Sequence, residues 1–315
     1  MSYRHLTTIQ REIIVRELAK LTPANKIADI LGIHRSTVYR EIKRNSIKGE
    51  YSGIKAQKLY RKRRVKCHRE KKLLIDSVLY DTVALRLEEY WSPEQIVGRH
   101  AIGISVPSIY RAINAGLLPR EIKQKCLRCH GKPYRRRGIK ETRGHLSGTT
   151  SIDRRTEEES SRLRLGDIEG DTVLGLQGTG AVVTLVDRKS RYLLCGKLPY
   201  KGAGKTADSI INILSHVPCL SLTLDNGKEF AGHAKISREL GIPVYFAHPH
   251  SPWQRGTNEN TNKLLRQFNP KGADIAKVTE QELKRYTGLL NNRPRKCLGF
   301  ATPAEVFLND GFCRT

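Results

Sequence analysis

The order of strand and helix signals after residue 161 constrains the fold of this chain more than any other feature of its sequence. Three strand-like apolar runs come first, in LGDIEGDTVLG, GAVVTLVD and RYLLCGKLP. A helical segment, KTADSIINILSHV, follows them, with Ile210, Ile211 and Leu214 on its apolar side. The remaining segments alternate between strand and helix: CLSLTLD, AGHAKISRELG, PVYFAH and a long helix that begins near Gly256. This order predicts a mixed five-stranded sheet with helices on both faces.

The same order is typical of the ribonuclease H-like fold, and we expect residues 161–315 to form a domain of this α/β class. In such a sheet the first and fourth strands are central neighbours. Asp171 lies on the first predicted strand, and Asp225 ends the fourth. Ligand sites in open α/β sheets gather at the carboxyl ends of strands, so we expect these two carboxylates to converge. The last helix can then return across the sheet and bring Glu259 to the same point.

The charge composition indicates a polyanionic partner. Lys and Arg number 57 against 31 Asp and Glu, which gives a formal net charge of +26 and a pI near 10. This balance favours a nucleic acid as partner, because phosphate neutralisation releases counterions. The alternative is a ribosome-associated or generally adhesive basic protein. The predicted helix-turn-helix of residues 1–46 makes double-stranded DNA the expected partner. In such a chain Asp171, Asp225 and Glu259 are the candidate catalytic and metal-binding residues. Their oxygen ligands predict two Mg²⁺ ions, with Mn²⁺ as a substitute, for phosphoryl-transfer chemistry.

Other acidic residues compete for this role. Asp167 and Glu169 lie on the same predicted strand face as Asp171, so position along the strand does not choose among the three. Glu229 follows Asp225 by four residues and is a candidate for a supporting position at the metal site.

The predicted helix of Glu259 adds candidate DNA contacts. Glu259, Lys263 and Arg266 recur at helical spacing and therefore share one face. A metal-binding acid beside two cations fits a helix that lies along a DNA backbone, and an ordinary surface Glu–Lys pair is the alternative. Trp253 and Arg255 precede the helix. Trp253 is expected either to stack on a base or to staple the loop.

The first 46 residues predict a helix-turn-helix DNA-binding domain, residues 1–46. A short helix, a turn that contains Gly32 and a second helix give the spacing of this motif. Val38 and Ile42 would face the core of the domain. The outward residues of the second helix are expected to contact DNA: Arg35, Thr37, Tyr39, Arg40, Lys43 and Arg44. The alternative is a three-helix bundle with a solvated basic face.

Three segments separate these two domains. Residues 47–90 read as a basic linker with helical parts, because Lys and Arg dominate residues 55–72. Residues 91–117 are similar to a second helix-turn-helix unit, with a structural connector as the alternative. Residues 118–160 lose periodicity and read as a basic interdomain linker.

Cysteine usage predicts a reducing compartment. Seven cysteines, an odd number, do not suggest a disulfide framework, so we expect a cytoplasmic, nucleoid-associated protein. Cys126 and Cys129 form a lone CxxC that would need further ligands to bind zinc. No apolar run is long enough to span a membrane, and the N-terminus lacks the apolar segment of a signal peptide.

Four motifs carry a resemblance to a known family: EGDTVLG, TLDNGKEFAGH, SPWQRGTNENTNKLLRQF and LLNNRPRKCLGFATPAEVF. With the N-terminal helices and WSPEQIVG, the chain resembles DDE transposases of the insertion-sequence-thirty family, which have a retroviral-integrase-like core, over nearly its whole length. The resemblance implies that Asp171, Asp225 and Glu259 are the metal-binding triad, and it favours Asp171 over Asp167. Ile168 departs from the pattern, because many members have Trp there, and this should affect packing more than chemistry.

The family implies a reaction. Its members bind the terminal inverted repeats of their own element, cleave the element ends and join the exposed 3′-hydroxyls to new phosphodiesters, with no covalent protein–DNA intermediate. They act as homo-oligomers on paired ends, and a circular DNA intermediate is expected. One alternative is a catalytically inactive helix-turn-helix regulator derived from a transposase. Another is a tyrosine or serine recombinase, for which no nucleophile in an Arg/His-rich site is apparent.

Overall fold

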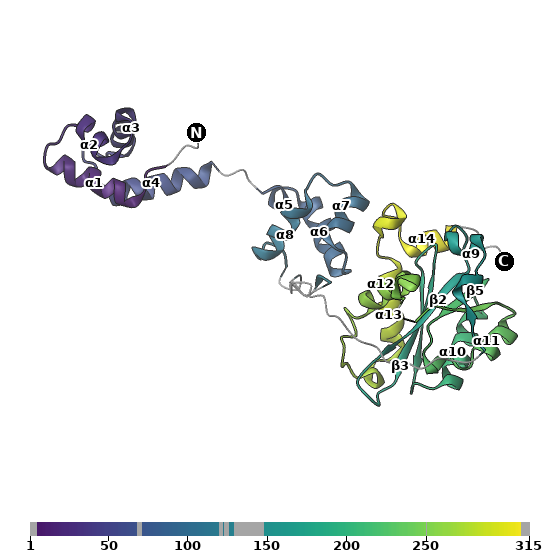
Figure 1. Ribbon diagram of the computed structural model, residues 1–315. Helices are drawn as coiled ribbons and strands as arrows, with labels where there is room; N and C mark the ends of the chain where they lie inside the picture. Colours follow the sequence, from purple (N-terminus) through teal and green to yellow (C-terminus); the bar gives the residue numbers. More distant parts are fainter. Residues whose placement is uncertain are drawn as a thin grey trace. The chain divides into compact units, whose positions relative to one another are not determined.

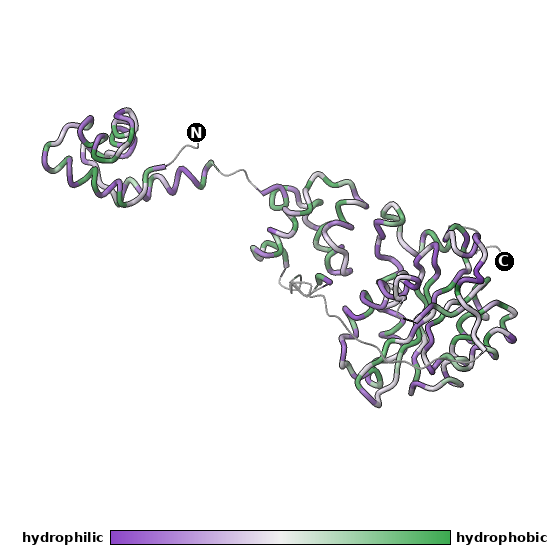
Figure 2. The backbone as a smooth tube through the Cα atoms, in the orientation of Figure 1, coloured by the Kyte–Doolittle hydropathy of each residue, from purple (hydrophilic) through white to green (hydrophobic). Residues whose placement is uncertain are grey.

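The computed structural model of this chain describes residues 5–67, 71–119, 122, 126–128, 148–249 and 251–309 (Figure 1). The chain divides into two compact units, Met1–Ile75 and Asp76–Thr315. Hydrophobic and hydrophilic residues alternate along the helices of both units (Figure 2). None of the described helices is long and apolar enough to cross a membrane.

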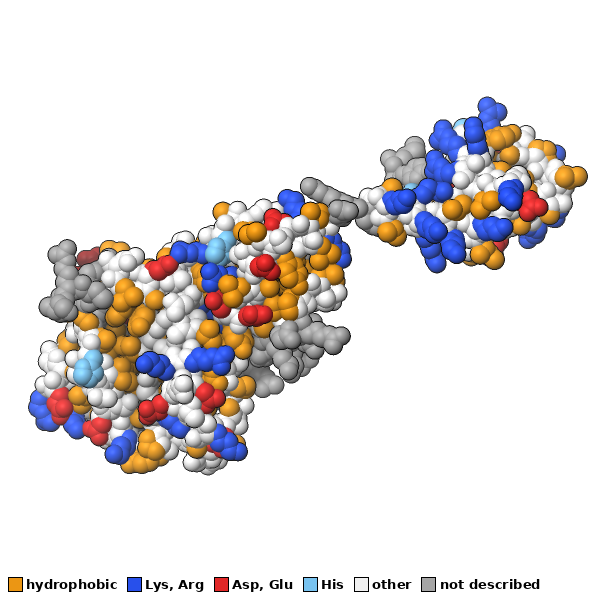
Figure 3. Space-filling view, turned by 180° about the vertical axis from the view of Figure 1, so that it is seen from behind, with side chains coloured by type: hydrophobic (Ala, Val, Ile, Leu, Met, Phe, Trp, Pro, Cys, Tyr) orange, Lys and Arg blue, Asp and Glu red, His pale blue; other side chains and the backbone are white. Residues whose placement is uncertain are grey.

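The N-terminal unit contains the helices α1 (Thr8–Ala19), α2 (Ala24–Leu31), α3 (Arg35–Asn45), α4 (Gly53–Lys66) and α5 (Lys72–Ile75). Gly32 ends α2 in the left-handed conformation, with φ of 61°, which glycine adopts without strain. Val38 is fully buried in a small core with Ile14 and Ile27, and Ile42 packs against it, as predicted. On the face drawn in Figure 3, Lys and Arg side chains gather over this unit.

One buried arginine connects three helices of the N-terminal unit. Arg11 of α1 is 2% exposed, and its Nε donates to Oε1 of Glu41 on α3 across 2.6 Å. The same guanidinium donates to Gln57 on α4 and to the carbonyl of Leu6. The basic helix α4 is therefore fixed to α1 and α3 through this side chain.

The second unit begins with three helices, α6 (Ser77–Glu88), α7 (Pro93–His100) and α8 (Val106–Asn114). Ser92 and Gln95 form a capping box at the start of α7. Ile96 and Ile109 are fully buried. Gln95 also donates from Nε2 to the carbonyl of Pro294, 2.8 Å away, so these helices contact the rest of their own unit.

The rest of the second unit is built on one mixed sheet. Its strands lie in the order β1 (Thr150–Ser151), β6 (Val244–Phe246), β5 (Ser221–Leu224), β2 (Asp167–Leu174), β3 (Ala181–Asp187) and β4 (Leu193–Leu198). The pairs β2–β3 and β3–β4 are antiparallel, whereas β2–β5, β5–β6 and β6–β1 are parallel. This is the predicted ribonuclease H-like α/β arrangement, with the first and fourth predicted strands as central neighbours.

The prediction of five strands was wrong, because the sheet has six. The additional strand, β1, pairs in parallel with β6 at the edge, Thr150 opposite Tyr245. It is two residues long and lies in the segment that reads as a linker. A two-residue strand is too short to produce an alternating hydrophobic pattern, so the sequence contains no periodic signal for it.

Helices cover both faces of the sheet, as predicted (Figure 1). One face packs against α10 (Ala203–Leu214) and α11 (His233–Leu240), with Ile168 in the buried cluster. The other packs against α12 (Gly256–Leu265) and α13 (Glu280–Asn291), with Leu264 and Leu265 turned inward. Short helices complete the unit: α9 (Glu157–Ser161), α14 (Pro303–Phe307), and the 3-10 turns η2 (Ile152–Arg154), η3 (Lys228–Phe230), η4 (Pro252–Arg255), η5 (Ile275–Lys277) and η6 (Lys296–Leu298).

Candidate functional site

Two of the predicted acidic residues lie side by side on the central strands. Glu169 of β2 is opposite Thr223 of β5 in a parallel register, so two residues further along Asp171 comes level with Asp225. Asp225 directly follows the last residue of β5. The order of elements that the sequence predicts is what makes these two strands neighbours.

Arg255 contacts both carboxylates. Its Nη2 donates to Oδ2 of Asp225 across 3.2 Å, and its Nη1 lies 3.7 Å from Oδ2 of Asp171. Nη1 also donates to the carbonyl of Gly170 across 3.1 Å. Arg255 is the last residue of η4, directly before α12, and only 14% of its side chain is exposed. Arg255 is thus paired with the two aspartates here, and its predicted contact with DNA stays a prediction.

The environment of Asp171 disfavours its ionised form. Burial raises its pKa to about 6, and the charges of Asp225 and Glu229 add to this, whereas the Arg255 guanidinium lowers it. Two hydrogen bonds orient the carboxylate: Nδ2 of Asn262 donates to Oδ2 across 2.9 Å, and the Thr172 amide donates to Oδ1 across 2.8 Å. The site therefore holds more negative charge than one arginine neutralises.

Glu229 brings a third buried carboxylate close to the pair. Its Oε1 accepts from the Thr172 hydroxyl and from Nζ of Lys201, each across 2.9 Å. Its Oε2 is buried and has no hydrogen-bond partner among the described residues. A Cβ on Gly227 would lie 2.5 Å from this Oε2 and 2.8 Å from Oδ1 of Asp225, so only glycine allows both carboxylates to approach. A carboxylate oxygen is the kind of ligand that a hard divalent cation such as Mg²⁺ prefers, and a buried one is costly without a partner.

Glu259 is in the first turn of α12, and its side chain points elsewhere. Nζ of Lys263 lies 2.6 Å from its Oε1, and 47% of the Glu259 side chain is exposed. Among the described residues no cluster of three or more His, Cys, Asp or Glu side chains could hold a metal ion in this arrangement. The structure thus brings together Asp171 and Asp225 but not Glu259, and the triad stays a prediction.

The competing acids on β2 have structural partners. Asp167 is buried, accepts from Arg164 across 2.9 Å and from the Ser221 hydroxyl across 2.6 Å. Glu169 is also buried, lies 3.2 Å from Nε of Arg188 and accepts the backbone amide of Asn258 across 3.0 Å. Glu169 therefore fixes the start of α12 to the sheet. Sequence alternation places both residues on the face of Asp171 but does not reveal these partners.

The remaining predicted DNA contacts of this unit differ in exposure. Lys263 is exposed and bound to Glu259, as the surface-pair alternative describes. Arg266 is half-buried, and its Nη1 has no hydrogen-bond partner in the described part of the chain. Trp253 is 70% exposed, which leaves its ring accessible to a base. Cys126 is buried, and Cys129, the other half of the CxxC, lies outside the described residues.

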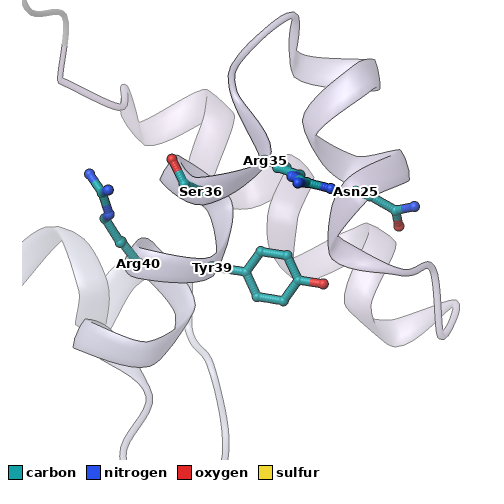
Figure 4. A pocket seen from close by; sticks show the side chains of 5 residues that line it. All are labelled: Asn25, Arg35, Ser36, Tyr39 and Arg40. Atoms are coloured by element: carbon teal, nitrogen blue, oxygen red, sulfur yellow. The ribbon is translucent and has the colours of Figure 1, made fainter.

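In the N-terminal unit, α3 presents the predicted basic surface. Arg35, Tyr39, Arg40, Lys43 and Arg44 are exposed, and Thr37 is half-buried. A shallow hollow of about 480 Å³ is lined by residues of α2 and α3: Asn25, Arg35, Ser36, Tyr39 and Arg40. In Figure 4, Arg35 and Tyr39 lie beside Asn25, whereas Arg40 extends away from them. The exposed fraction of Tyr39, 56%, leaves its ring available to a partner.

Comparison with known proteins matches both units. Residues 2–45 match the family model of a helix-turn-helix domain. The chain is 41% identical to the transposase for insertion sequence element IS4351 of Bacteroides fragilis, over 96% of this chain and 95% of that protein. It is 36% identical to the transposase InsI for IS30A of Escherichia coli K12, over 96% of this chain and 83% of that protein.

A further relative is the transposase for IS1086 of Cupriavidus metallidurans, 36% identical over 96% of this chain and 94% of that protein. Among solved structures, the catalytic core domain of BIV integrase aligns at 22% identity with a TM-score of 0.36, over 45% of this chain and 93% of that one.

Proposed function

Because the chain belongs to the insertion-sequence-thirty family of transposases, we propose that it binds the terminal inverted repeats of its own insertion sequence and catalyses metal-dependent cleavage and transfer of DNA strands. The observation that carries the catalytic part is the pairing of Asp171 with Asp225 on neighbouring strands. Burial and mutual repulsion raise the pKa of Asp171 to about 6, which marks a site built to concentrate negative charge.

Asp171, Asp225 and Glu259 are the residues that would hold divalent ions, two Mg²⁺ with Mn²⁺ as a substitute. Bound there, the ions would activate a water or a 3′-hydroxyl and stabilise the leaving oxygen of a phosphodiester. The unpartnered Oε2 of Glu229 supports this donor set, because a buried carboxylate oxygen needs a cation or a donor.

The chain's own contacts support a role for Glu259. Asn258 and Asn262 of α12 both bond to β2, through Glu169 and Asp171 respectively. Glu259 lies between them in the sequence, so the helix backbone beside it is fixed close to the aspartates. A change of rotamer away from Lys263 would bring the carboxylate toward the pair.

The basic parts of the chain are proposed to bind the DNA. The exposed residues of α3 are proposed to contact the inverted repeats, with Arg35, Tyr39 and Arg40 nearest the hollow. Trp253, Lys263 and Arg266 are proposed to follow the DNA near the aspartates. Homo-oligomers on paired ends, and action at the nucleoid in the cytoplasm, complete the proposal.

The paired state of Glu259 and Lys263 keeps one alternative open, an inactive DNA-binding regulator. The test uses the full chain, a duplex with the end of its own element and a scrambled duplex. A transposase nicks and joins the element end only when Mg²⁺ is present. A regulator binds the same end selectively and leaves it intact in Mg²⁺, and that result would overturn the catalytic proposal.

A further inference from the structure

A second cavity lies beside the N-terminal turn of α12. Its volume is about 170 Å³, enough for several water molecules. Three arginines line it, Arg162, Arg191 and Arg295, from three separate segments of the chain. Residues of α12 also line it, with the hydroxyl and amide groups of Thr257, Asn260 and Thr261, and Cys297 contributes a thiol. None of the described lining residues is Asp or Glu.

Two of the arginines in this cavity have guanidinium nitrogens that lack hydrogen-bond partners in the described part of the chain. Arg295 is 8% exposed, and its Nη2 donates to the carbonyl of Leu290 across 3.0 Å. Its Nε is buried and has no hydrogen-bond partner within the ranges that the structure describes. Arg162 makes no hydrogen bond or ion pair with any described residue. Burial lowers the pKa of both guanidiniums. A buried cation without a partner is costly, so the arrangement calls for an anion.

The carboxylate whose charge reaches this cavity already has another partner. Glu169 acts on Arg162 through its charge, but it pairs with Arg188 across 3.2 Å. Arg191 directs Nη1 to the hydroxyl of Thr257, 2.7 Å away, which holds the guanidinium over the start of α12. The positive end of the α12 dipole, a helix of ten residues, adds to the field of the arginines.

Two of the arginines have an unusual backbone. The φ angles of Arg162 and Arg191 are 62° and 65°, in the left-handed region that residues other than glycine seldom adopt. Such conformations persist where the surrounding structure requires them, and they cluster at binding sites. Here they present two guanidiniums to one cavity from different loops.

We propose that this cavity binds a phosphate of the DNA backbone and thereby sets the position of the strand relative to Glu259. The inference rests on the proposed function, since it assumes DNA as the substrate. Thr257 and Asn260 flank Glu259 within one turn of α12, whose pitch is about 5.4 Å. A phosphate held by the arginines would therefore lie close to the residue that is proposed to act on the strand.

The test compares two full-length variants that each lose one positive charge. Arg162→Gln changes the cavity, and Arg238→Gln changes an exposed arginine of α11, which packs on the opposite face of the sheet. Fluorescence anisotropy measures binding of the element-end duplex over a series of salt concentrations, without divalent cation. The slope of log K against log salt should become shallower by about 0.9 for Arg162→Gln, the loss of one phosphate contact. The slope for Arg238→Gln should match that of the wild type.

A second measurement locates the phosphate. Neutral methylphosphonates are placed one at a time along the duplex. One position should weaken wild-type binding several-fold and leave Arg162→Gln unaffected, which identifies the pair by a double-mutant cycle. Asn260→Ala, at an exposed position, should show a weaker form of the same effect and serves if Arg162→Gln does not fold.

An unchanged salt slope and an unchanged methylphosphonate profile would overturn the inference. So would a lowered thermal midpoint of Arg162→Gln with normal DNA binding, because the cavity would then hold a carboxylate of the chain itself. Neither assay involves strand cleavage. A protein that shows the predicted slopes but never cleaves DNA would keep its phosphate site and lose the catalytic proposal.

Discussion

Arg255 donates a hydrogen bond to Asp225 across 3.2 Å, and the same guanidinium lies 3.7 Å from Asp171. In this structure the aspartate pair therefore binds the guanidinium of Arg255. A divalent ion at this site would compete with it for the same oxygens. DNA phosphates would in turn compete with the aspartates for Arg255, so metal, arginine and DNA are coupled through one side chain.

Arg255→Gln should bind Mn²⁺ more tightly, because the competing cation is removed. We expect the dissociation constant to fall about tenfold, or about 1.4 kcal/mol, by isothermal titration calorimetry at pH 8. Lys235→Gln, which removes an exposed cation from α11, is the matched control. Weaker Mn²⁺ binding by Arg255→Gln would show that the arginine supports the metal site and does not compete.

Metal binding should depend on pH through Asp171. Burial raises its pKa from 3.8 to about 6, so the stability that its neutral form contributes is present below about pH 4 and is lost as pH rises through about 6. The ionised form is also the one that ligates a metal. Mg²⁺ should therefore raise the thermal midpoint more at pH 8 than at pH 5. Equal shifts at both pH values, or the same shift in Asp171→Asn, would contradict this assignment.

Glu169→Gln should destabilise the second unit without removing a catalytic group. It leaves Arg188 buried without its counter-charge, which costs about 3–5 kcal/mol. In a unit of this size the thermal midpoint should fall by roughly 10 °C. Glu239→Gln, which removes a 3.9 Å surface pair with Lys235, should change it little. A stable but inactive Glu169→Gln would instead place this residue in the reaction.

The alternation of strands and helices was enough to predict that Asp171 and Asp225 are neighbours, because the order of elements determines which strands pair. It was not enough to predict their partners. Arg255, Glu169 and Arg188 meet through side chains that are distant in sequence, and no local pattern encodes such contacts. The strand β1 was also missed, because two residues are too few to show an alternating hydrophobic pattern.

Arg40→Ala should weaken recognition of the element end. If its exposed side chain reads a base, binding of the end duplex should fall by about 1–3 kcal/mol, while binding of the scrambled duplex changes less. Arg16→Ala, which changes an arginine of α1 that pairs with Glu17, is the control. Competition binding with the two duplexes measures the ratio. An unchanged ratio would move base recognition away from this part of α3.

Strand transfer by triad variants tests the central claim most directly. The full chain is given its element end, a target duplex and Mg²⁺, and joined product is measured alongside end binding for the wild type, Asp171→Asn, Asp225→Asn and Glu259→Gln. Glu259→Gln is the sharpest of these, because its surface pair with Lys263 contributes only a few tenths of a kcal/mol to stability. The account predicts that all three variants bind the end and that joining falls to background. Robust joining by any one of them would contradict it.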